Sequence, residues 1–259
     1  MTNNILPLFK SHYSLGRSIL TLDKPAERDG KHPDSIFEIL EDEGMDEFYL
    51  VDDNISGYLQ ANINAEELNK KLIFGIRITI LNDANDKTDT SKKTESKAVI
   101  FARNKEGYQN LIKIWSKAAQ GGFYYVPRID RSAFEGLNME NNLLSIPFYD
   151  SYIYNNNFTC GLCVPDFLSD FKHKVFMYED NDMPFDTNLK DLVKSESEER
   201  SCQLIKAKSI YYKNNKDFIS YLTFKALQNR GTLEKPNLDH MCSNYFSFEQ
   251  WKIQEANYV

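Results

Sequence analysis

Residues 103–114 have the sequence Arg103-Asn104-Lys105-Glu106-Gly107-Tyr108-Gln109-Asn110-Leu111-Ile112-Lys113-Ile114, and residues 121–130 have the sequence Gly121-Gly122-Phe123-Tyr124-Tyr125-Val126-Pro127-Arg128-Ile129-Asp130. Apolar side chains recur at i, i+3, i+4 and i+7 in the first run, at Tyr108, Leu111, Ile112 and Trp115. This spacing predicts a helix over Lys105 to Ala119 that buries this stripe. Arg128, which follows Pro127, is a candidate structural anchor for the aromatic loop before it.

Short apolar or β-branched segments alternate with helical patterns on both sides of this stretch. The short segments predict seven strands, at Leu6 to Phe9, Glu47 to Val51, Leu72 to Leu81, Lys97 to Ala102, Asn142 to Pro147, Lys174 to Tyr178 and Gln203 to Ile210. The intervening patterns predict further helices at Asp34 to Glu43, Ala65 to Lys71, Asn188 to Arg200 and Lys216 to Arg230. Alternating strands and helices predict parallel pairing through right-handed crossovers, and a chain of this length favours an α/β barrel. An open doubly wound sheet is the alternative.

The length of 259 residues and the hydrophobic content of 41% suit one domain over residues 1–259. Residues 82–96 have no apolar periodicity, so we expect a solvated, mobile insertion there.

The formal charge of -7 argues against a surface that binds nucleic acid strongly through its phosphates. No apolar run approaches the roughly 18 residues of a spanning helix, and we expect a cytoplasmic protein without membrane contact. Four cysteines in this length are too few for a disulfide framework, so reduced thiols are expected.

The two runs quoted above closely resemble a stretch of the N-terminal PHP domain (polymerase and histidinol phosphatase) of the bacterial DNA polymerase III alpha subunit. The resemblance extends from about Pro7 to Trp251, and it includes a run from Phe224 to Thr232 that is similar to a family helix and its Gln-x-Gly turn. It implies a distorted TIM-like (β/α)7 barrel of the PHP type.

The metal-binding motifs of the family are largely replaced in this sequence. Tyr13-Ser14-Leu15 places the family's His-x-His pair on Leu8 and Lys10. The family's motif Thr-Asp-His-Gly looks like Val51-Asp52-Asp53-Asn54 in this sequence. Its motif Gly-x-Glu looks like Gly75-Ile76-Arg77. Its motif Asn-Asp-x-His-Tyr looks like Lys208-Ser209-Ile210-Tyr211-Tyr212. The resemblance therefore implies a former metal pocket without catalytic residues, lined by Leu8, Lys10, Asp52, Asp53, Arg77, Ser209 and Tyr211.

Only Asp52 and Asp53 among these residues are natural metal ligands, so we expect no cofactor, with Mn, Zn or Mg as the alternative if the site is partly retained. Clustered carboxylates repel one another unless a cation lies among them. Our hypothesis is that Lys10 and Arg77 form ion pairs with Asp52 and Asp53 and replace the charge of the metal. The alternative is that all four are ordinary solvated charges at strand ends.

Two other groups of residues are weaker candidates. Cys160 and Cys163 have CxxC spacing and would make a zinc site with Cys202 and Cys242, or else all four are inert. The run Glu179-Asp180-Asn181-Asp182 lacks the glycine and terminal Glu of an EF-hand, which favours a solvated turn that leads into a helix.

Three functional classes agree with these observations. The first is a catalytically inactive PHP-like domain, a pseudoenzyme with a structural or protein-binding role in DNA replication, whose partners are the polymerase and proofreading exonuclease subunits. The second is a metal-dependent PHP phosphoesterase or 3′-5′ exonuclease. The third is a free-standing decoy, encoded for example by a phage, that binds a replisome partner. If the gene continues past residue 259, the parent protein is expected to be a DNA-directed DNA polymerase.

Overall fold

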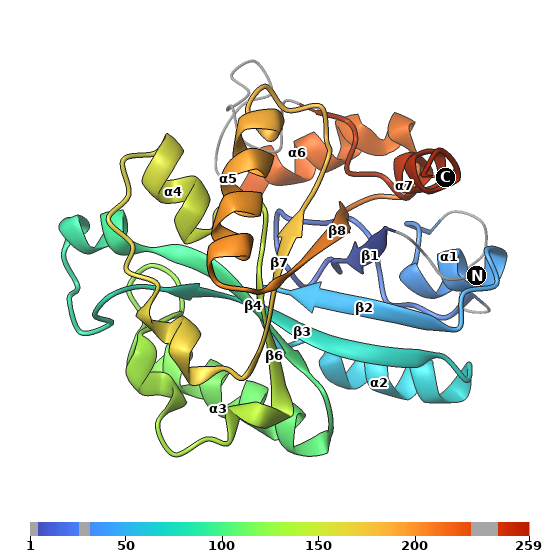
Figure 1. Ribbon diagram of the computed structural model, residues 1–259. Coiled ribbons are helices and arrows are strands. Elements are labelled where there is room, and N and C mark those ends of the chain that lie inside the picture. Colours follow the sequence, from blue (N-terminus) through green and yellow to red (C-terminus); the bar gives the residue numbers. More distant parts are fainter. Residues whose placement is uncertain (1–4, 26–31, 229–242, 259) are drawn as a thin grey trace. The chain divides into compact units, whose positions relative to one another are not determined.

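The computed structural model describes residues 5–25, 32–228 and 243–258. Its strands are β1 Leu6–Phe9, β2 Glu47–Asp52, β3 Lys71–Ile80, β4 Ser96–Ala102, β5 Arg128–Ile129, β6 Asn142–Ile146, β7 His173–Tyr178 and β8 Gln203–Ile210. Its α-helices are α1 Ile36–Asp42, α2 Tyr58–Glu67, α3 Lys105–Gln120, α4 Tyr152–Phe158, α5 Asp186–Glu199, α6 Phe218–Gln228 and α7 Phe248–Ala256. Figure 1 labels most of these elements.

The strands are hydrogen-bonded in the order β2-β1-β8-β7-β6-β4-β3-β5, and a further pairing between β2 and β3 closes the ring. Strand β5 pairs outside this ring, with β3. The predicted mixed α/β fold with a closed seven-stranded barrel is therefore confirmed. The alternative of an open doubly wound sheet is wrong.

Two compact units make up the chain: a first unit of Met1–Ile73, Glu179–Asp186 and Lys206–Val259, and a second unit of Phe74–Tyr178 and Thr187–Ile205. In the first unit β1 runs parallel to both of its neighbours, with Leu8 opposite Tyr49 of β2 and Ser209 of β8. The carboxyl ends of these three strands consequently lie at one edge. Beneath them, the rings of Phe9, Phe37, Phe48 and Phe248 pack against one another with centroids 5.5 to 6.5 Å apart.

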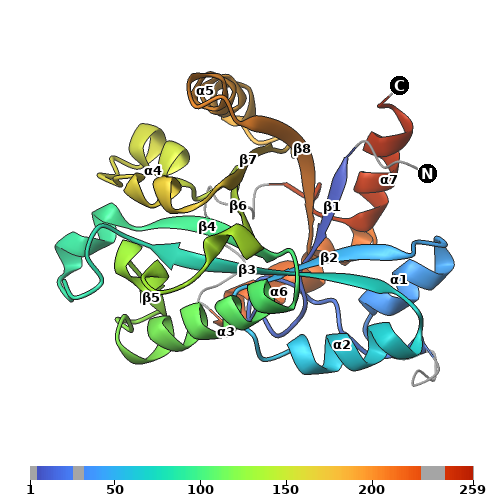
Figure 2. The ribbon, with the colours of Figure 1, turned by 60° about the horizontal axis from the view of Figure 1, so that its bottom comes forward.

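In the second unit β4 runs antiparallel to both β3 and β6, whereas β6 and β7 are parallel. The expectation of parallel pairing throughout is wrong at β4, because the segment between β3 and β4 carries only the short 3-10 helix Asp89–Thr94 in place of a crossover helix. Helix α3 packs along β4 and β5, as Figure 2 shows.

The buried face of α3 differs from the predicted stripe. Gly107, Leu111, Ile114 and Ala118 are buried, whereas Ile112 is 37% exposed. Gly107 explains why the buried face of α3 is turned away from the predicted stripe, because a Cβ atom at this position would lie 2.2 Å from the carbonyl oxygen of Asn141. The close approach of backbone to backbone fixes which side of the helix faces the sheet.

Other element predictions also need correction. Helix α2 begins seven residues before the predicted Ala65 and ends at Glu67; Asn69 follows in the left-handed region at φ 52°, and Lys71 already belongs to β3. Its exposed side carries Leu59 and Ile63, so apolar residues do not mark its buried face. Strand β5 and helices α4 and α7 were not predicted, because each is too short for a periodic pattern to stand out.

Candidate functional site

The first unit places a buried carboxylate at the end of β2. Asp52 is fully buried and accepts hydrogen bonds from the backbone N–H of Ser11 at 2.8 Å, from Ser11 Oγ at 2.6 Å and from Ser14 Oγ at 2.8 Å. Burial raises the pKa of Asp52, and the charge of Lys10 and the serine hydrogen bonds act in the opposite direction. Asp52 therefore fastens the loop that follows β1 to the end of β2.

Lys10 lies beside this carboxylate and is only 5% exposed. Its Nζ donates to Asp53 Oδ1 at 2.9 Å, and the guanidinium of Arg17 approaches the other Asp53 oxygen at 4.0 Å. The ion pair that the sequence suggested between Lys10 and an aspartate of this loop is present. Lys10 is therefore not a freely solvated charge.

Arg77 belongs to β3 in the second unit, where its guanidinium forms an ion pair with Asp150. Its pairing with Asp52 or Asp53 stays a prediction. Asp150 follows β6 closely and has a positive φ of 59°.

The end of β7 contributes a carboxylate that sequence reasoning missed. Glu179 is 5% exposed and accepts hydrogen bonds from the backbone N–H of Ser209 at 3.0 Å and from Ser209 Oγ at 2.7 Å. Burial raises the pKa of Glu179. The solvated turn expected at residues 179–182 is wrong for Glu179 and for the fully buried Asn181. The signal was available, since Glu179 follows the last residue of a predicted strand.

Lys208 is a second buried cation next to this carboxylate. It is fully buried, and its Nζ donates to the carbonyl oxygen of Asp180 at 3.1 Å and to Asn181 Oδ1. Burial lowers the pKa of Lys208 to about 8, against the opposing effect of Glu179, Asp180 and Asp186.

Aromatic packing surrounds the position where the family resemblance places a histidine. Tyr211 stacks on Phe246 with centroids 5.2 Å apart and on Tyr221 at 5.7 Å, at interplanar angles of 10° and 21°. It is 7% exposed, as is Leu8 on β1. Both positions therefore belong to the packed interior of the first unit.

These residues do not fit a multinuclear metal centre. Such a centre needs imidazoles and carboxylates that converge with free lone pairs. Here Leu8 and Tyr211 are packed among apolar groups, and serine, lysine and backbone donors already contact Asp52, Asp53 and Glu179. Within residues 5–25, 32–228 and 243–258, no group of three or more His, Cys, Asp or Glu side chains is arranged to hold an ion. That the pocket once held metal stays a prediction.

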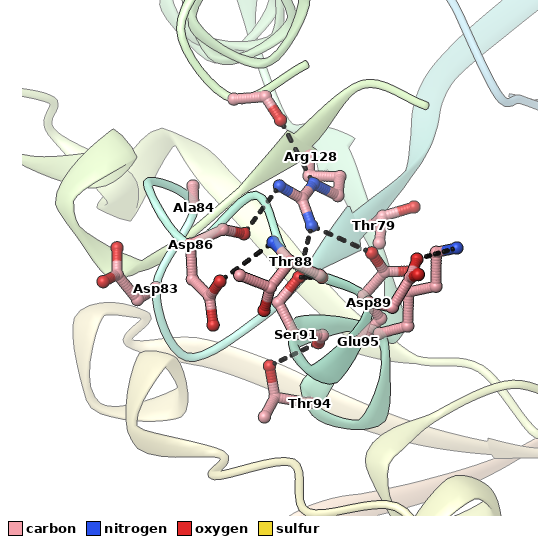
Figure 3. A network of polar contacts seen from close by, with 12 residues as sticks. Thr79, Asp83, Ala84, Asp86, Thr88, Asp89, Ser91, Thr94, Glu95 and Arg128 are labelled. Atoms are coloured by element: carbon pink, nitrogen blue, oxygen red, sulfur yellow. Dashed lines mark hydrogen bonds and ion pairs between the residues drawn. The ribbon is translucent and has the colours of Figure 1, made fainter. Parts of the chain in front are cut away.

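Arg128, from the run of residues 121–130, is the centre of a network of polar contacts in the second unit (Figure 3). Arg128 is fully buried: its Nε donates to the carbonyl oxygen of Gly122 at 3.2 Å, and Nη2 donates to that of Asp86 at 3.1 Å. Nη1 donates to Ser91 Oγ at 3.0 Å and pairs with Glu95 Oε1 at 3.1 Å. Arg128 thus anchors both the aromatic loop and residues 82–96, whose predicted mobility remains untested.

The described cysteines form no disulfide. Cys160, Cys163 and Cys202 are free thiols, and Cys242 lies outside the described residues. Cys163 Sγ donates to the carbonyl oxygen of Glu95 at 3.0 Å, and burial raises its pKa to about 11. Its thiol is therefore protonated at neutral pH, which does not suit a redox nucleophile.

A sequence model of the PHP domain family matches residues 29–152 of this chain. The DNA polymerase III alpha subunits of Helicobacter pylori strains 26695 and J99 are each 36% identical to it over 80 residues. That match covers 30% of this chain and only 6% of the length of either relative.

A crystal structure of a proposed metal-dependent phosphoesterase from Bifidobacterium adolescentis aligns with a TM-score of 0.44 at 9% identity, over 78% of this chain and 86% of that chain. In the described part of this chain, no helix has the length and apolar character needed to cross a membrane.

Proposed function

We propose that this chain is a catalytically inactive PHP domain with a structural or protein-binding role in a DNA polymerase III-like replication machinery in the cytoplasm. The observation that carries the proposal is the position of Lys10 Nζ, 2.9 Å from Asp53 and 5% exposed, where the family resemblance places a metal-binding histidine. An ammonium there supplies the positive charge that neighbouring carboxylates require, and it repels a divalent cation.

The hydrogen bonds of the two buried carboxylates support the same conclusion. Asp52 is bound by Ser11 and Ser14, and Glu179 by Ser209. A buried carboxylate without such donors would be strongly destabilising, so these serines stabilise the domain in the absence of metal.

An exposed aromatic loop supports a role in protein binding. Phe123, Tyr125 and Val126 are 49%, 72% and 42% exposed, and Tyr125 has a positive φ of 61°. Lys92 Nζ lies over the Tyr125 ring at 4.7 Å from its centroid and holds it in place. Exposed aromatic side chains on a fixed backbone are typical of the centres of protein interfaces.

Metal binding and hydrolysis test the catalytic half of the proposal. We expect mass spectrometric metal analysis after incubation with Mn²⁺, Zn²⁺ or Mg²⁺ to find no stoichiometric ion. We expect no hydrolysis of bis-p-nitrophenyl phosphate and no 3′-5′ shortening of a labelled oligonucleotide. Stoichiometric metal together with hydrolysis that Asp52→Asn abolishes would establish the phosphoesterase or exonuclease alternative in place of ours.

A pull-down tests the binding half. The full chain should retain the polymerase and proofreading exonuclease subunits of its own organism, and Phe123→Ala with Tyr125→Ala should weaken retention. Ile112→Ala, which removes an exposed apolar side chain from α3, is the matched control and should have no effect. If neither subunit is enriched, the replisome role is wrong. If the chain retains a subunit and displaces the host PHP domain from it, the decoy role is favoured.

A further inference from the structure

A cavity of about 390 Å³ opens in the second unit between α4 and α5, which lie side by side in Figures 1 and 2. Its size falls within the range of small-ligand pockets. Ile153, Pro165 and Leu192 line its apolar part, while Ser195 and Glu196 line its polar part. It therefore presents an apolar wall and a carboxylate to the same space.

The carboxylate is held in place from one side only. Tyr152 Oη donates to Glu196 Oε1 at 2.8 Å, and Arg200 Nε donates to the same oxygen at 2.7 Å. Burial, with the hydrogen bond to Glu196 adding to it, raises the pKa of Tyr152, so its hydroxyl remains a donor at neutral pH. Among the described residues no hydrogen bond reaches Glu196 Oε2, which is thus available to a ligand.

Further negative charge lies on the same face of α5. Residues separated by three or four positions on a helix are neighbours, and Leu192, Ser195, Glu196 and Glu199 form one such row. Asp191 lies four positions before Ser195 and extends it. Arg200 pairs with Glu196 and Lys194 lies three positions after Asp191, so Glu199 remains as the further negative charge of this row. The cavity therefore favours a cation.

We propose that this cavity binds a primary ammonium or guanidinium group on an aliphatic stem. The cation donates to Glu196 Oε2 and Ser195 Oγ, and the stem packs against Ile153, Pro165 and Leu192. This chemistry has two sources, a free small amine and a lysine or arginine side chain of a protein partner. The inference does not depend on the proposed replisome role, since the residues that line the cavity are not those of the exposed aromatic loop.

Calorimetric titration of the full chain tests it with agmatine, Nα-acetyl-lysine methylamide and the neutral Nα-acetyl-norleucine methylamide. Both cations should bind, and the neutral probe should not. Glu196→Gln should weaken binding at least about tenfold, since a charge-assisted hydrogen bond is lost. Glu198→Gln is the matched control, because Glu198 is exposed and lies two positions away, on another side of α5.

Ser195→Lys provides a second test that does not disturb folding, because Ser195 is exposed. Its own ammonium should occupy the cavity and abolish binding of both cations. If agmatine binds more tightly than Nα-acetyl-lysine methylamide, the ligand is a free amine. If Nα-acetyl-lysine methylamide binds equally or more tightly, the ligand is a side chain of a protein partner. Absence of binding by either cation, equal binding of the neutral probe, or an equal loss in Glu198→Gln would overturn the proposal.

Discussion

Ser209 donates two hydrogen bonds to the Glu179 carboxylate, from its backbone N–H at 3.0 Å and from its hydroxyl at 2.7 Å. The two residues come from the end of β7 and from β8, and one serine therefore satisfies both oxygens of a buried acid. The family resemblance places a metal-binding aspartate at position 209. In this chain Ser209 is there instead, and it donates to a carboxylate.

Ser209→Ala should make stability more sensitive to pH. Burial raises the folded-state pKa of Glu179 above its ordinary value, so its unfavourable contribution is absent at acid pH and grows as pH rises through that range. Without the hydroxyl the pKa should rise further, with a loss of about 1–2 kcal/mol at pH 7 and a much smaller loss at pH 4. Urea unfolding at both pH values measures this difference. An equal loss at the two pH values would show that the hydroxyl does not act through the Glu179 charge.

Lys208 should produce a rise in stability at alkaline pH. Its folded-state pKa of about 8 lies below the ordinary 10.5, so the unfolded chain binds more protons between these values and the free energy of unfolding increases with pH there. The increase should approach about 3 kcal/mol. Lys208→Met should remove it, whereas Lys206→Met, which removes a half-buried lysine from the same strand, should retain it. Parallel curves for the wild type and Lys208→Met would contradict the buried cation.

Lys10→Met should destabilise the first unit by about 3 kcal/mol, because it leaves Asp52 and Asp53 without their buried cation. Equilibrium unfolding at pH 7 measures the loss, which should shrink as pH falls and Asp52 is protonated. Lys172→Met breaks an ion pair with Glu140 in which both side chains are more than 60% exposed, and it should change stability by less than about 0.5 kcal/mol. Similar effects of the two substitutions would mean that the Lys10 pair is an ordinary surface contact.

Arg128→Met should loosen residues 82–96 selectively. It removes donors to the buried Ser91 and to the half-buried Asp86 and Glu95 at once, and a loss of about 3 kcal/mol is expected in the second unit because three acceptors lose their partner together. Hydrogen exchange should accelerate in residues 86–95 while β6 and β7 stay protected. Arg131→Met, which breaks an exposed pair with Asp170, is the control and should leave exchange in 86–95 unchanged.

Much of the fold was predictable because strands that are buried on both faces leave short apolar runs between polar boundaries. All seven ring strands were found within two residues of their ends, and β1 and β8 at their observed bounds. The antiparallel setting of β4 was not predictable in the same way, because strand direction depends on how the chain returns between β3 and β4. The predicted buried face of α3 was wrong, because a backbone contact at Gly107 decides which face is buried and a glycine leaves no trace in the hydrophobic pattern.

The candidate site was predictable in its positions more than in its contacts. Lys10 and Arg77 were expected to form ion pairs with Asp52 and Asp53; the pair of Lys10 with Asp53 is present, whereas that of Arg77 with either aspartate stays a prediction. The position of Glu179 directly after a predicted strand marked it as a candidate, but the burial of Glu179 and Lys208 was missed, because the serine and amide groups that enclose them come from distant parts of the sequence. Sequence spacing carries no information on such long-range hydrogen bonds.

The Tyr211 stack also bears on how this domain is able to evolve. Tyr211→His would remove ring contacts with Phe246 and Tyr221 while Leu8 and Lys10 still offer no ligands. This substitution alone should therefore lower stability without creating a metal site. Under our proposal that the metal site was lost, the packed aromatic rings keep a single substitution at Tyr211 from recovering it.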